Sequence, residues 1–105
     1  MIDLPCWSEQ LRRWCTSEAY ISELWLFGSF AKGCATPDSD IDLACVMAGA
    51  ERLANWIFES DRMKAEIEAL IPGKKISLNH FDPHRSTGIV ADAVREYGRL
   101  LYKRA

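Results

Sequence analysis

The sequence has no apolar run approaching the ~20 residues that a membrane-spanning helix requires, which excludes a membrane protein. Its first five residues lack the basic region and apolar core of a signal peptide. Basic residues are not in excess, since 13 Lys and Arg stand against 15 Asp and Glu, for a net charge of −2. We therefore expect no strong nucleic-acid binding. Nucleotide binding stays open, because metal ions can neutralise the phosphates.

Cysteine spacing gives no sign of a zinc site or a redox pair. The four cysteines, at positions 6, 15, 34 and 45, form no Cys-x-x-Cys pair, and neither histidine has a cysteine nearby in sequence. We therefore expect four reduced thiols in a cytoplasmic protein.

Repeats, low-complexity tracts and linkers are absent as well, so we expect a single domain over residues 1–105. Apolar spacing and turn residues predict helices and strands in alternation. The expected helices cover 4–16, 29–33, 51–71 and 87–97, and the expected strands cover 24–27, 41–47, 75–81 and 100–102. The last strand could instead extend the preceding helix. This order favours an α/β (α+β) sandwich.

Two of the expected helices carry an apolar stripe that should face the core. In 51–71 it comprises Leu53, Trp56, Ile57, Met63, Ile67 and Leu70, and in 87–97 it comprises Ile89, Val90, Ala93, Val94 and Tyr97. The chain also has four tryptophans, many for so small a core. Trp7 and Trp14 recur at helical spacing in 4–16 and should pack in the core. Because tryptophan is favoured at interfaces, we expect some of the four to lie at one, in a homodimer or a complex with another protein.

A turn able to hold phosphate follows the first expected strand. The apolar run 24–27 ends at Gly28-Ser29, which opens a short helix. Free amides and the positive dipole end of a helix start attract phosphate. Gly28 would let an anion approach the backbone closely, and Ser29 adds a hydroxyl donor. Taken alone this turn is weak evidence, because many helices begin in this way without a ligand.

A pair of carboxylates stands at the start of the second strand. Asp40 and Asp42 are two residues apart, so they project from the same face while Ile41 and Leu43 point into the core. Adjacent carboxylates repel each other unless a cation lies between them, and magnesium prefers such oxygen ligands. Alternatively, Asp40 belongs to a solvated loop and Asp42 lines an exposed strand face. Together with Gly28-Ser29, the pair predicts binding of a triphosphate with Mg²⁺.

Three polar residues near this motif are weaker candidates. Lys32 lies one helical turn after Ser29, where it could face a phosphate or solvent. Ser39 lies directly before Asp40 and is a candidate nucleotide contact, whereas Asp38, beside a proline, reads as a turn former.

The segment from Gly28-Ser29, through Ala31, Gly33 and Pro37, to Asp38-Ser39-Asp40-Ile41-Asp42-Leu43 resembles the signature of the minimal nucleotidyltransferases, members of the DNA polymerase beta superfamily. The resemblance implies a nucleotidyltransferase-like mixed β-sheet with helices packed mainly on one face. It also implies transfer of a nucleoside monophosphate, AMP from ATP being the expected case, to a hydroxyl acceptor. Gly28 and Ser29 would then hold the outer phosphates, and Asp40 and Asp42 would hold Mg²⁺.

One residue of the family pattern is missing. Members of this family usually carry a third carboxylate on a later strand, and Ser77 stands at the matching position of 75–79. Asn79, on the same face, or Asp82, in the following loop, could compensate. A general base contributes about 10²–10⁴-fold in rate. The chain is therefore either an active transferase or a catalytically weakened relative that binds nucleotide or a partner.

The resemblance also suggests a partner. Many stand-alone members of this family work beside a small helical HEPN-domain protein, as the antitoxin of a toxin–antitoxin pair. Three functions therefore compete: a transferase, a binding protein that covers its partner, and an α/β domain whose aspartate pair is structural.

Overall fold

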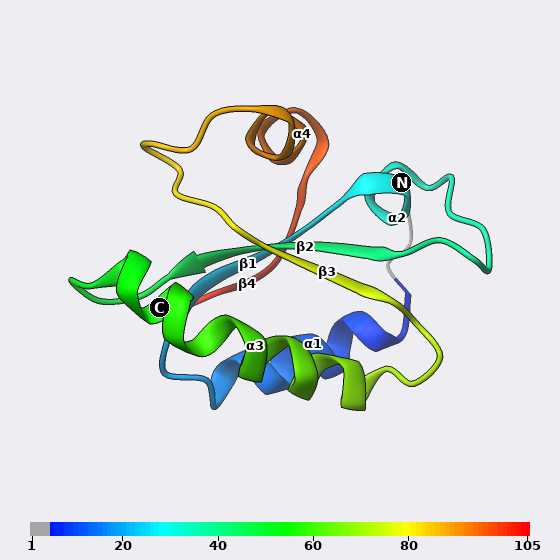
Figure 1. The fold of residues 1–105 in the computed structure, drawn as a ribbon. Coiled ribbons are helices and arrows are strands. Elements are labelled where there is room, and N and C mark those ends of the chain that lie inside the picture. Colours follow the sequence, from blue (N-terminus) through cyan, green and yellow to red (C-terminus); the bar gives the residue numbers. More distant parts are fainter. Residues whose placement is uncertain (1–4) are drawn as a thin grey trace.

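The computed structural model describes residues 5–105 as four helices alternating with four strands (Figure 1). In chain order these are α1 (Trp7–Thr16), β1 (Ile21–Phe27), α2 (Gly28–Lys32), β2 (Ile41–Met47), α3 (Arg52–Leu70), β3 (Ile76–His80), α4 (Ile89–Tyr97) and β4 (Arg99–Lys103). The predicted order is confirmed, and residues 99–103 form a strand. Position 4, where the first helix was expected to begin, lies outside the described residues. β1 starts three residues earlier than expected.

The four strands form one mixed sheet in the order β3-β2-β1-β4. β1 pairs antiparallel with both β2 and β4, while β2 pairs in parallel with β3. Consequently β1 ends, and β2 and β3 begin, at the same end of the sheet. The turn at Gly28 and the start of β2 at Ile41 are thereby brought together.

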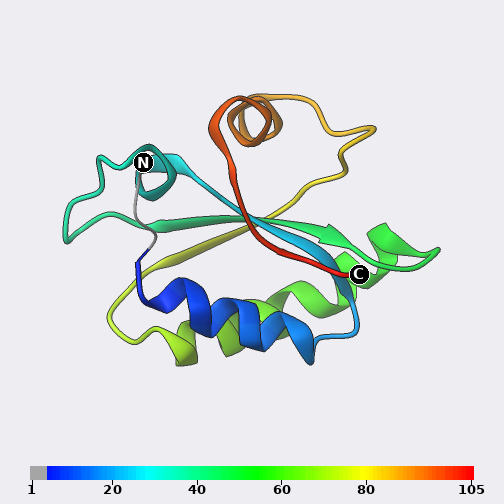
Figure 2. The ribbon, with the colours of Figure 1, turned by 180° about the vertical axis from the view of Figure 1, so that it is seen from behind.

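Helices cover both faces of the sheet. α1 and α3 lie side by side on one face and α4 lies on the other, as the front and back views show (Figures 1 and 2). The larger core lies under α1 and α3, and its fully buried members include Leu11, Leu24, Leu43, Met63 and Ile67. The two longest helices thus share one face, as the resemblance implied, and α4 adds a cover on the opposite face.

A smaller core lies between the sheet and α4. It joins Phe27 and Ala44 of the strands to Ala91 and Val94 of α4. Side chains alternate between the faces of a strand. Asp42, two residues before Ala44, therefore projects on the α4 side, opposite to the larger core.

The apolar stripe predicted for α3 is only partly correct. Met63 and Ile67 are fully buried, but Leu53 and Ile57 are 61% and 65% exposed. Trp56, in the second turn of α3, packs against the core and lies beside His80 at the end of β3, so this part of the helix still lies over the sheet. Successive helix residues are about 100° apart, so Ile57 is turned off the face that carries Trp56, Met63 and Ile67. Leu53 lies in the first turn of α3, before the residues that reach the core. Leu70, at the other end of α3, is also exposed.

The prediction that Ile89 faces the core is wrong. Ile89 is 89% exposed, because it is the first residue of α4 and lies off the face that carries Ala91 and Val94. Val90, Ala93 and Tyr97 do pack against the core.

Within residues 5–105, the structure has no helix that is both long and apolar enough to cross a membrane.

Candidate active site

The site begins at the junction of β1 and α2, where Gly28 packs against Asp42. Gly28 has a φ of +74°, in the left-handed region that glycine adopts without strain. A Cβ at this position would overlap Oδ2 and Cγ of Asp42. The backbone of Gly28 and the Asp42 carboxylate are therefore in direct contact, and glycine is required for both conformation and space.

The strand register places Asp42 between two neighbours. Asp42 pairs with Phe27 of β1 on one side and with Ser77 of β3 on the other. Asp40 lies one residue before β2 and is exposed. The carboxylate pair predicted from the spacing therefore stands beside the phosphate-binding turn predicted from Gly28-Ser29.

Neither carboxylate forms an ion pair with a residue of 5–105. Partial burial raises the pKa of Asp42, and the charge of nearby Asp40 raises it further. The ion pairs within residues 5–105 lie elsewhere, around Arg12 and Arg62. Ionised Asp42 is therefore an unfavourable charge in this position, and a bound cation would relieve it.

The donor set fits a magnesium ion that arrives with a nucleotide. Among the described residues, there is no group of three His, Cys, Asp or Glu side chains that could hold a metal. A dedicated protein cage is therefore not present. Magnesium, however, commonly uses one or two carboxylates together with waters and substrate phosphates. Asp40 and Asp42 supply those carboxylates, and a triphosphate at the Gly28 turn would supply the remaining anionic oxygens.

The position expected for a third carboxylate is adjacent to Asp42. Ser77, which occupies it, is the register partner of Asp42 in the parallel β2–β3 pair. Nδ2 of Asn79 donates to Ser77 Oγ at 3.2 Å and to the Leu43 carbonyl oxygen at 3.3 Å. The structure thus places two neutral side chains, bonded to each other, where the resemblance led us to expect an acid.

Asp82 is not brought to this site. It lies five residues beyond Ser77, about 16 Å along the strand direction, and one of its carboxylate oxygens accepts the His84 N–H at 2.9 Å. That hydrogen bond, together with Arg52 and other neighbours, lowers the pKa of Asp82. The carboxylate stabilises the loop after β3 at the opposite end of the sheet.

The remaining candidates take part in local contacts around the site. Lys32 Nζ lies 4.4 Å from the centroid of the Tyr97 ring, so α4 holds the lysine by a cation–π contact. Ser39 Oγ accepts the Thr36 N–H at 2.8 Å, which closes the loop before β2. Ser29 is half-buried in the first turn of α2, and its carbonyl oxygen accepts the Cys34 N–H at 3.0 Å.

Sequence reasoning missed Tyr97 as a neighbour of this site. It was assigned to the inner face of its helix, and no local spacing links it to Lys32. Only the pairing of β4 beside β1, which sets α4 over the sheet, brings the two residues together. No pattern within either segment could have predicted this contact.

A search of the curated proteins found no match to this sequence. The family model described as polymerase beta, nucleotidyltransferase, matches residues 9–105. Among solved structures, one described as a toxin–antitoxin with AMP-PNP shares 18% identity and a TM-score of 0.59, covering 95% of this chain and 75% of that one.

Two further structures have the same fold. A tri-AMPylated Shewanella oneidensis HEPN toxin in complex with MNT antitoxin gives a TM-score of 0.59 at 15% identity, over 92% of this chain and 70% of that one. The toxin–antitoxin MntA–HepT gives 0.58 at 15% identity over the same shares. At this identity they establish the fold. Since the family model spans nearly the whole described chain, the protein belongs to the polymerase beta nucleotidyltransferase family.

Proposed function

We propose that this protein transfers a nucleoside monophosphate, AMP from ATP, to a hydroxyl group of another protein in the cytoplasm, with Mg²⁺ as cofactor. The observation that carries the proposal is the contact between Gly28 and the Asp42 carboxylate, with Asp40 alongside. This arrangement unites a turn suited to phosphate with paired carboxylates suited to a metal. A triphosphate bound with magnesium needs both.

Each residue has a defined part in this reaction. Gly28 and Ser29 would hold the outer phosphates, with Lys32 and Ser39 as further nucleotide contacts. Asp40 and Asp42 would hold magnesium, and the bound ion would supply positive charge to stabilise the transferred phosphate. The acceptor oxygen bonds to the α-phosphorus as the bond to pyrophosphate breaks, and the hydroxyl proton passes to solvent. Alignment and charge neutralisation, rather than covalent catalysis, provide the acceleration.

The proposed acceptor is a HEPN-domain toxin. One structural neighbour is described as a tri-AMPylated HEPN toxin in complex with MNT antitoxin, and another as the toxin–antitoxin MntA–HepT. Docking of a partner protein would bring the acceptor to the site.

A second function is favoured by Ser77. Because a neutral side chain stands beside Asp42, the chain could bind nucleotide and toxin and neutralise the toxin by covering it. Loss of a general base alone lowers a rate by about 10²–10⁴-fold. Binding would survive that loss, since it depends on Gly28, Ser29 and the two aspartates.

The decisive experiment uses ATP labelled at the α-phosphate, Mg²⁺ and a candidate HEPN partner. Transfer predicts label on the partner, no label from γ-labelled ATP, and loss of labelling in Asp42→Asn. Magnesium-dependent ATP binding without label transfer, whatever divalent metal is supplied, would leave only the covering function. Absence of both binding and transfer would mean that the aspartate pair is structural.

Restoring the missing acid sharpens this test. Ser77→Asp places a carboxylate beside Asp42, so we expect transfer to rise by about 10-fold or more. Ser77→Asn, similar in size and uncharged, is the matched control and should leave the rate near that of the unmodified protein. Equal rates in the two variants would show that this strand position takes no part in transfer.

A further inference from the structure

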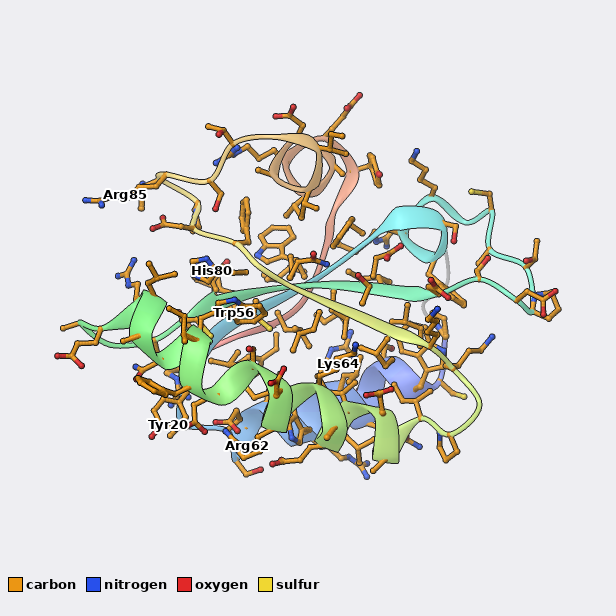
Figure 3. The ribbon with its side chains drawn as sticks, in the orientation of Figure 1. Tyr20, Trp56, Arg62, Lys64, His80 and Arg85 are labelled. Atoms are coloured by element: carbon orange, nitrogen blue, oxygen red, sulfur yellow. The ribbon has the colours of Figure 1, made fainter. Side chains whose placement is uncertain are left out.

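A hollow of about 510 Å³ lies at the opposite end of the sheet from Gly28. Its walls come from the first turn of α3, the end of β3 and the loop after β3. Figure 3 shows His80 and Arg85 at this end, away from α2. Asp82, on its wall, is about 16 Å along the strand direction from the level of Asp42. One small ligand therefore cannot occupy both places.

Positive charge predominates in this hollow. Arg52 and Arg85 line it together with a single carboxylate, Asp82. Arg52 Nε donates to the Gly49 carbonyl oxygen at 3.2 Å, which holds the guanidinium against the wall. One oxygen of Asp82 accepts the His84 N–H, so part of this negative charge is turned into the loop. Two guanidiniums against one partly engaged carboxylate favour an anion.

Two further hydrogen-bond donors are available in the same hollow. Ser86 Oγ accepts the Asp82 N–H at 2.8 Å, so its own hydrogen is left to donate elsewhere. α3 begins here, and its N-cap residue Glu51 makes no side-chain hydrogen bond to the first-turn amides. Arg52 and Leu53, in that first turn, line the hollow. Amides and the dipole at this helix end add to the attraction for a negative group.

The other walls suit an organic group. Leu53 exposes 61% of its surface. The centroid of the His80 ring lies 5.5 Å from that of the Trp56 ring, and the two planes are inclined at 37°. Figure 3 shows the two side chains next to each other. Burial lowers the pKa of His80, which favours the uncharged form of this ring. The volume lies within the ~300–1,000 Å³ range of small-molecule sites and exceeds what a bare phosphate would fill.

We propose that this hollow binds a small phosphate monoester of the size of a nucleoside monophosphate. Arg52, Arg85, Ser86 and the start of α3 contact the phosphate, and Leu53 and His80 contact the organic part. The site is separate from the transferase site, and it does not depend on the proposed reaction.

The test titrates the metal-free protein, in EDTA, with AMP and separately with inorganic phosphate. Calorimetry measures the affinity, and the NMR shifts of the backbone amides locate the binding site. We expect AMP to shift amides of 49–53 and 80–86 and to bind more tightly than phosphate. The same result is expected in Asp42→Asn, which keeps this hollow intact. Shifts centred on Gly28 and Asp42 instead, or no binding of AMP, would overturn the proposal. Equal affinity for phosphate and AMP would overturn the role of the organic group.

Three substitutions complete the test. Arg85→Ala should weaken AMP binding by about 10-fold, the effect of one charge-assisted contact. Arg13→Ala, which removes an exposed arginine from α1, is the matched control and should leave affinity unchanged. Asp82→Asn should tighten binding severalfold, a gain that a misfolded variant could not produce. Unchanged affinity in Arg85→Ala or weaker binding in Asp82→Asn would contradict the assigned contacts.

Discussion

At the residue scale, the contact between Gly28 and Asp42 makes Gly28 sensitive to the smallest substitution. Gly28→Ala adds a Cβ that overlaps the carboxylate and also strains a backbone with φ +74°. The strain alone costs about 1–2 kcal/mol, and overpacking adds about 1–3 kcal/mol. We expect a loss of unfolding free energy equal to the sum, measured by urea denaturation.

Gly73→Ala separates the two costs. Gly73 has a similar φ of +85°, but an added Cβ there would have nothing within 4 Å. The loss of unfolding free energy in this control should therefore reflect the backbone strain alone. Equal losses in the two variants would mean that Asp42 moves away freely, and that its contact with Gly28 does not position the carboxylate.

Asp42 itself should lower the stability of the metal-free protein. Its pKa is raised in the folded state, so the ionised carboxylate is disfavoured there relative to the unfolded chain. This cost is present at neutral pH and disappears as pH falls through the raised folded value towards the unfolded value of 3.8. Asp42→Asn should therefore stabilise the protein at pH 7 in EDTA by less than about 1 kcal/mol, because solvent screens the charges.

The pH dependence identifies the cause of this stabilisation. The advantage of Asp42→Asn should shrink towards zero near pH 3, and Asp38→Asn, an exposed site in the preceding loop, should show no such gain. Thermal unfolding at several pH values measures both. A less stable Asp42→Asn variant at pH 7 would show that the carboxylate is favourable without metal.

At the element scale, the sequence pattern of α3 identified the centre of its buried face but not its width. Met63, at that centre, is fully buried, and Phe58, about 140° from it around the helix, is 79% exposed, as the spacing predicts. Leu53 and Ile57, at the edge of the predicted stripe, are exposed as well. Spacing identifies the apolar side of a helix, but how much of that side the sheet covers is a property of the folded molecule.

This difference in burial predicts that two truncations in α3 will have very different effects on stability. Met63→Ala should cost about 2–5 kcal/mol by leaving a cavity in the core. Phe58→Ser should change the free energy of unfolding by about 0.5 kcal/mol or less, as expected for exposed sites. Chemical denaturation of the two variants measures the difference. A loss of more than about 2 kcal/mol in Phe58→Ser would mean that the first half of α3 is packed in solution, against another part of this chain or a second copy.

At the scale of the whole molecule, the sequence predicted the order of elements but not how the strands meet. The motif from Gly28 to Leu43 predicted that the Gly28 turn and both aspartates form one site, because these residues lie close together in sequence, and the structure brings Gly28 and Asp42 into contact. Ser77 was identified only through the family resemblance, and its place beside Asp42 depends on the parallel pairing of β2 with β3. Lys32 with Tyr97, and the hollow near Arg85, depend on contacts between distant segments.

The four tryptophans pack mostly within the domain. Trp7 is buried, and Trp14, Trp25 and Trp56 pack half-buried against the two cores. The aromatic residues that suggested an interface are therefore used mainly within the domain. Self-association stays a prediction. The exposed apolar residues of α3, such as Ile57 and Phe58, now support it better than the tryptophans do.

Binding of nucleotide and metal together should stabilise the entire domain. A ligand that binds only the folded state adds about 2.7 kcal/mol at 100 times its dissociation constant. For a domain of this size each kcal/mol raises the melting temperature by about 4–8 °C. We expect ATP with Mg²⁺ to give such a rise in a thermal shift assay, and ATP in EDTA to give much less, because Asp40 and Asp42 repel the uncompensated phosphates. Asp42→Asn should lose the magnesium-dependent part, while Arg85→Ala should keep it. A rise that is equally large without metal would show that the carboxylates and the triphosphate do not share a cation.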